Sequence, residues 1–86
     1  MPKQINEQTS YMRAIGFDLR QSYDSEGRVQ YVGIAYPKAK DSEIKWQIYK
    51  LKYDSSSRLT HRAYANGTDA FTLEWDERVN YSYPNL

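Results

Sequence analysis

The chain has 86 residues, with 12 Lys and Arg against 11 Asp and Glu, and it contains no cysteine. A chain of this length forms one domain with a small core, and the lack of cysteine excludes disulfides and thiolate metal sites. The even charge argues against a dedicated nucleic-acid-binding protein, which usually carries a clear basic excess, and no apolar run approaches the roughly 20 residues of a membrane helix.

Residues 1–10 are predicted to form a flexible N-terminal arm, and residues 11–86 a single β domain. The arm has too little apolar content to pack on its own. We therefore expect a neighbouring subunit to hold it, with Ile5 and Tyr11 as anchors and its backbone adding to a sheet edge.

Two segments predict β-hairpins of the same design. Tyr23-Asp24-Ser25-Glu26-Gly27-Arg28-Val29 is repeated thirty residues later as Tyr53-Asp54-Ser55-Ser56-Ser57-Arg58-Leu59. Each lies between two runs rich in aromatic and β-branched residues, as is typical of a hairpin. The Asp carboxylate at the start of such a turn can accept a hydrogen bond from the backbone N–H two residues on.

The first hairpin is predicted from a strand over 13–22, whose Ile15, Phe17 and Leu19 share one face, and a strand over 28–36. Gly33 in the second of these strands allows a bulge or the close approach of another backbone.

In the third predicted strand, 44–53, the apolar residues change from one face to the other partway along. Ile44, Trp46 and Ile48 share one face, and then Tyr49, Leu51 and Tyr53 share the other. Two explanations stay open: a bulge between Ile48 and Tyr49, or a strand that is covered on both faces. Trp46 lies between Ile44 and Ile48 on one face of what should be the central strand, so it is predicted to be a core residue.

The rest of the chain predicts a fourth strand over 58–65, an Asn66-Gly67 turn, a short helical turn over 70–75, and a last strand over 79–83. No βαβ unit is indicated. The expected fold is therefore all-β with one short helical turn: a small antiparallel β-sandwich or barrel of about five strands, built from two similar hairpins.

No catalytic residue, cofactor site or metal site is predicted. His61 is the only histidine, and a general base needs an orienting partner and a nucleophile within reach. Ser55-Ser56-Ser57 is better explained as a run of residues that favour a turn. The carboxylate pairs Asp69/Glu74 and Asp76/Glu77 are typical of a solvated surface. We therefore expect that the protein is not an enzyme.

Nine tyrosines and two tryptophans are the unusual part of the composition. Large rings supply buried area to a small β core, and they are also enriched in protein interfaces, so both roles stay open. Trp75 and Arg78, within Trp75-Asp76-Glu77-Arg78, fit a core ring beside a turn or an interface anchor. The candidate interface residues are Ile5, Tyr11, Tyr36, Tyr49, Tyr64, Trp75 and Arg78.

Residues 23–83 resemble a set of small, mostly uncharacterised proteins of tailed bacteriophages. The shared pattern is a Tyr-x-Gly-x-Ala strand, a Trp-x-Ile-x-Lys strand, an Ala-x-Gly turn, a Phe before Trp-Asp-x-Arg, and a closing Tyr-x-Tyr. It is carried here by Tyr31–Ala35, Lys45–Asp54, Ala65–Gly67, Phe71, Trp75–Arg78 and Tyr81–Tyr83. The loop over 36–40 departs from the pattern, since its counterpart is richer in Pro, Gly and Ser.

The resemblance implies a structural component of the virion: a decoration or connector module of head, neck or tail that acts by protein–protein association in a symmetric oligomer. Its partners would be other phage structural proteins and copies of itself, without nucleic acid or membrane, and it would be assembled in the host cytoplasm. One alternative is a module that binds carbohydrates or glycans of the host surface. Its exposed rings would be Tyr36, Tyr49, Tyr64 and Trp75. Another is a regulator that binds a host protein through a sheet edge.

Overall fold

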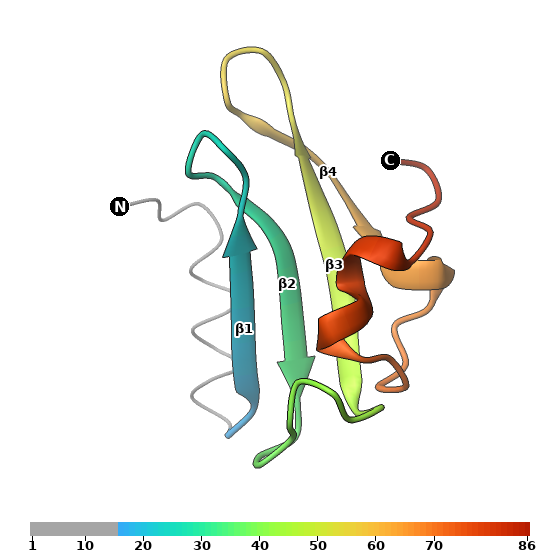
Figure 1. The fold of residues 1–86 in the computed structure, drawn as a ribbon. Helices are drawn as coiled ribbons and strands as arrows, with labels where there is room; N and C mark the ends of the chain where they lie inside the picture. Colours follow the sequence, from blue (N-terminus) through green and yellow to red (C-terminus); the bar gives the residue numbers. More distant parts are fainter. Residues whose placement is uncertain (1–15) are drawn as a thin grey trace.

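The computed structural model describes residues 16–86, which form one antiparallel sheet with the strand order β1-β2-β3-β4 (Figure 1). Two short 3-10 turns, η1 and η2, follow the last strand. The elements are β1 (Asp18–Tyr23), β2 (Val29–Ala35), β3 (Trp46–Tyr53), β4 (Leu59–Tyr64), η1 (Ala65–Gly67) and η2 (Trp75–Asn80). The predicted all-β class and the two consecutive hairpins are confirmed. The first strand begins later than predicted, at Asp18, and Ile15 with the rest of 13–15 lies outside the described residues.

The expected fifth strand over 79–83 is wrong. These residues lie in η2 and in the irregular segment after it. Side-chain hydrogen bonds, rather than pairing with a strand, hold this segment. The Tyr83 hydroxyl donates to the Arg78 carbonyl at 2.6 Å, and the Tyr81 hydroxyl accepts from the Glu74 N–H at 2.9 Å. Within residues 16–86 the sheet is therefore open and has four strands, and the five-stranded sandwich or barrel is not formed there.

The predicted helical turn over 70–75 is displaced, because η2 begins only at Trp75. Leu73 pairs instead with Trp46 in an isolated antiparallel bridge, with N···O distances of 2.9 and 3.0 Å in the two directions. A bridged residue has an extended backbone, so a helix cannot run through it. Phe71 and Trp75 consequently pack on different clusters of the core.

The phase change in β3 has a clear structural explanation. Ile48 and Tyr49 pair consecutively with Gly33 and Val32, so no bulge separates them. Both faces of the strand are buried: Trp46 and Ile48 are fully buried on one face, and Tyr49 and Leu51 are buried on the other. Of the two explanations that the sequence left open, the covered strand is correct.

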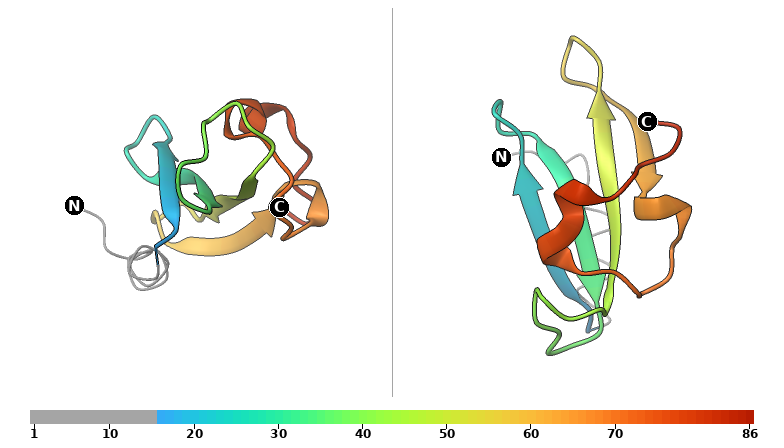
Figure 2. Two further views of the ribbon diagram at one scale, coloured as in Figure 1. Left: turned by 90° about the horizontal axis from the view of Figure 1, so that it is seen from below. Right: turned by 45° about the vertical axis from the view of Figure 1, so that its right-hand side comes forward.

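The C-terminal segment from η1 onward lies over one face of the sheet (Figures 1 and 2). Tyr81 and Tyr83 pack against the cluster formed on this face. The buried members of this first cluster are Tyr31, Ala35, Ala39, Trp46, Ile48, Ala65, Leu73 and Trp75.

A second buried cluster belongs to the opposite residues of the same strands. Partly buried aromatic and aliphatic side chains surround it, among them Phe17, Leu19 and Phe71. Its buried members are Val29, Val32, Ile34, Tyr49 and Leu51. Residues on both faces are therefore buried along most of β2 and along β3 as far as Leu51, whereas Lys52 near the end of β3 is exposed.

Gly33 leaves space in the sheet for the Trp75 ring of the C-terminal segment. A Cβ at this position would lie 2.5 Å from Cε3 of Trp75 and 3.1 Å from Cε3 of Trp46. The sequence predicted a close approach here by a backbone, whereas the structure places an indole ring against the glycine. The two indoles also contact each other, with ring centroids 6.2 Å apart.

Gly33→Ala should lower the free energy of unfolding by about 1–3 kcal/mol, the usual cost of overpacking a core. Urea denaturation of the variant measures the loss. In a Trp75→Leu background the clash is relieved, so the same Gly33→Ala change should cost clearly less. Equal losses in the two backgrounds would contradict the packing described.

Trp46→Ala should cost about 3–5 kcal/mol, because it empties a fully buried aromatic site. A domain of this size has little more stability than that, so the variant should be unfolded or insoluble. Ile44→Ala is the matched control, since the sequence placed Ile44 on the same face but its side chain is 64% exposed. The control should melt within a few degrees of the unchanged protein.

Candidate functional site

The turn of the first hairpin is organised by Asp24. Its Oδ1 accepts hydrogen bonds from the backbone N–H of Glu26 and of Arg28, both at 2.9 Å, and its Oδ2 accepts one from Arg28 Nε at 2.8 Å. Gly27 closes the turn with a φ of +82°, in the left-handed region. The predicted bond to the N–H two residues on is confirmed.

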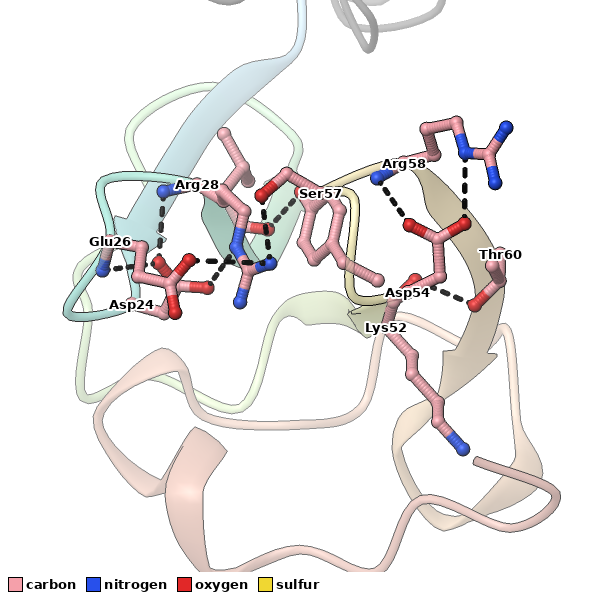
Figure 3. A network of polar contacts seen from close by, with 10 residues as sticks. Asp24, Glu26, Arg28, Lys52, Asp54, Ser57, Arg58 and Thr60 are labelled. Carbon is pink, nitrogen blue, oxygen red and sulfur yellow. Dashed lines mark hydrogen bonds and ion pairs between the residues drawn. The ribbon is translucent and has the colours of Figure 1, made fainter.

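The second turn repeats this arrangement around Asp54 (Figure 3). Asp54 Oδ1 accepts from Ser56 N–H at 2.9 Å and Arg58 N–H at 3.0 Å, and Oδ2 accepts from Arg58 Nε at 2.9 Å. Ser57 takes the left-handed position, with a φ of +62°. Each hairpin also has a register shift next to its turn, at Ser22/Tyr23 and Lys52/Tyr53, so both turns are built to one plan.

The two turns differ in their surroundings. The Arg28 guanidinium lies 4.7 Å from the centroid of the Tyr53 ring, and its Nη1 donates to Ser57 Oγ at 3.3 Å (Figure 3). The Tyr53 hydroxyl donates to the carbonyl of Val29. The first turn is thereby tied to the second hairpin, whereas the Arg58 side chain is 78% exposed.

The turn of the second hairpin and the start of β4 form the longest exposed stretch of the described chain. Eight consecutive residues, 55–62, are exposed, so they include the turn and the first four residues of β4. The tip of this hairpin projects beyond that of the first hairpin (Figures 1 and 2). β4 is also an edge of the sheet, so alternate backbone N–H and C=O groups along it face away from β3.

The second hairpin is basic as well. Residues 46–64 contain Lys50, Lys52, Arg58 and Arg62 against the single carboxylate Asp54, a formal charge of +3. The remaining residues contain eight Lys and Arg and ten Asp and Glu, a formal charge of −2. The overall charge of +1 conceals this asymmetry, so it was not predicted from the sequence.

Two of the predicted interface residues are buried. Tyr49 belongs to the second cluster and makes an edge contact with Tyr64, which is half-buried, at a centroid distance of 5.7 Å. Burial raises the pKa of the Tyr49 hydroxyl.

Trp75 belongs to the first cluster, and the Arg78 guanidinium lies 4.4 Å from the centroid of its ring. Arg78 is itself partly buried, and its Nη1 donates to the Trp75 carbonyl at 3.1 Å. Trp75 is therefore a core ring beside a turn.

Tyr36 is the candidate that the structure places on the surface, with 59% of it exposed. Its ring contacts Phe17 and Phe71, at centroid distances of 4.8 and 5.1 Å. Ile5 and Tyr11, with the whole predicted arm over 1–10, lie outside the described residues.

The four rings proposed for glycan binding do not form a common surface. Tyr49 and Trp75 are buried, and they belong to clusters on opposite faces of the sheet. A stacking platform for a sugar requires exposed rings that face the same way, so this arrangement removes the support for that alternative.

Among residues 16–86, no group of three or more His, Asp or Glu side chains is placed to hold a metal ion. His61 is exposed, and its Nδ1 lies 2.9 Å from the Thr60 hydroxyl next to it in β4. No helix in the described part of the chain has the length and apolar character to span a membrane.

Comparisons of the chain with protein-family models, with curated proteins and with solved structures gave no match.

Acid should weaken the two turns together. Hydrogen bonds from the backbone of Arg28 and Arg58 lower the pKa of Asp24 and Asp54 respectively. A carboxyl group whose pKa is lowered by folding stabilises the protein above its unfolded pKa of about 3.9, and this contribution is lost as the pH falls through the lowered value. Melting temperatures measured from pH 7 to pH 2 should therefore fall more steeply for the unchanged protein than for an Asp24→Asn/Asp54→Asn variant.

At pH 7 the single variant Asp24→Asn should lower the melting temperature more than Asp54→Asn does. The reason is that Asp24 also orients Arg28 against Ser57 and Tyr53, whereas Arg58 points into solvent. Equal effects of the two substitutions would show that the contact between the hairpins contributes little.

Proposed function

We propose that the protein is a structural component of a tailed-phage virion that acts by protein–protein association. The resemblance of residues 23–83 to small phage proteins supports the setting. The observation that carries the mode of action is the projecting second hairpin, with residues 55–62 exposed and the β4 edge at the border of the sheet. Oligomers commonly cover such edges, which otherwise invite uncontrolled pairing.

In this proposal the open sheet is completed by its neighbours. A strand or sheet of an adjacent subunit would supply the fifth strand and close the sandwich or barrel that the sequence predicted. The partners are other virion proteins and copies of this chain, in a symmetric assembly of the head, neck or tail.

The proposal does not require an active site. The strongest polar arrangements in the described chain are the two aspartate-centred turns, and their oxygens are already engaged by the N–H groups of their own turns. Groups that are satisfied internally in this way support a scaffold rather than catalysis.

Mass spectrometry of purified virions from the phage that encodes the protein tests the proposal. The protein should be present in intact particles at a fixed copy number relative to the major capsid protein. Abundance in the infected-cell lysate together with absence from intact particles would overturn the virion assignment. Light scattering after size-exclusion chromatography should give a defined oligomer, and a strict monomer at high concentration would contradict self-association.

A further inference from the structure

The β4 edge differs from an ordinary protected edge strand. Leu59, Thr60, His61 and Arg62 are all exposed, although Leu59, His61 and Arg62 pair with residues of β3 on their other side. In β1, at the other end of the sheet, five of the six residues are at least partly buried. Main-chain groups at an exposed edge can accept another extended chain as an added strand.

Near this edge, positively charged side chains lie on both faces of the sheet. Lys52 pairs with His61 across the ladder, and Lys50 pairs with Ala63. Arg62 pairs with Leu51, and its guanidinium lies 5.0 Å from the Tyr49 ring centroid, so it belongs to the opposite face. Lys52 is exposed and makes no salt bridge within residues 16–86, whereas Asp54 is bonded to Arg58. The Lys50 ammonium lies over two rings of the first cluster, 5.3 Å from the centroid of Tyr31 and 5.7 Å from that of Tyr83.

This charge selects the kind of strand that can pair. Two copies joined symmetrically through β4, with the pairing centred near Arg62, would bring that guanidinium close to its own counterpart, and like charges that face each other across a ladder are destabilising. A strand with carboxylates would instead meet cations on each face. Opposite charges directly across a ladder contribute favourably.

We propose that the β4 edge of the second hairpin binds an extended acidic segment of another polypeptide as an added strand. The inference rests on the proposed function only in that both require a partner chain. It adds the position of the contact, the backbone pairing and the charge of the partner.

Three capped peptides of eight residues test the proposal: alternating Glu-Val, alternating Gln-Val, and Glu-Val with alternate backbone N–H groups methylated. The ¹⁵N-labelled full chain is titrated with each, and amide shifts are followed. The Glu-Val peptide should shift the amides of 59–64 and bind at least tenfold more tightly than the Gln-Val peptide. Methylation on the pairing side should abolish the shifts. Equal binding of the methylated peptide would overturn the proposal, because attraction by charge alone does not need the backbone.

Lys52→Glu should weaken binding of the Glu-Val peptide at least tenfold. Lys40→Glu, in the loop at the opposite end of the sheet, makes the same change in net charge and should leave binding unchanged (Figure 1). Equal effects of the two variants would overturn the proposal. So would a single-stranded dT oligonucleotide that binds the hairpin while the Glu-Val peptide does not.

The outcomes separate this inference from the virion proposal. Peptide binding by a protein that is absent from particles would overturn only the virion assignment. A protein that is present in particles but shows no shifts at 59–64 with the acidic peptide would overturn only the strand-addition inference.

Discussion

The contact between Trp75 and Gly33 is the constraint on which the rest of the described structure depends. The indole occupies space that a Cβ at position 33 would need, and the bridge between Trp46 and Leu73 holds the preceding segment against the start of β3. The segment from η1 onward is thereby used to cover the sheet. An apolar face of a sheet must be buried against another element, so this cover is part of the core.

The strands of the sheet differ in how deeply they are buried. Its two central strands are buried on both faces, whereas β4 begins with four exposed residues. The two turns follow one plan, but Arg28 ties the first into the body of the protein and Arg58 leaves the second in solvent. Both hairpins contribute strands to the core, and the turn and β4 of the second hairpin present a basic edge.

The charge of the β4 edge determines which partner strands can pair with it in the proposed association. Its positive charge disfavours symmetric pairing with itself, which protects the free protein, and favours a partner strand of opposite charge. A contact between unlike surfaces of neighbouring subunits closes into a ring when the rotation between them permits. The symmetric oligomer proposed for a virion and the acidic strand proposed for β4 are thus compatible.

Local chemistry in the sequence determined the all-β class, the two matched hairpins, the aspartate-centred turns and the burial of Trp46. Each of these depends on neighbouring residues, on alternation over a few positions, or on a turn that only certain residues favour. The tertiary structure decided the path of residues 70–83, the ring that fills the space above Gly33, and the burial of Tyr49 and Trp75. Alternation of Val79, Tyr81 and Tyr83 predicted a strand, but contacts with residues distant in the chain hold this segment over the sheet. Whether a tyrosine is core or surface depends on what packs against it from elsewhere, because its ring suits both environments and its own sequence neighbours do not distinguish them.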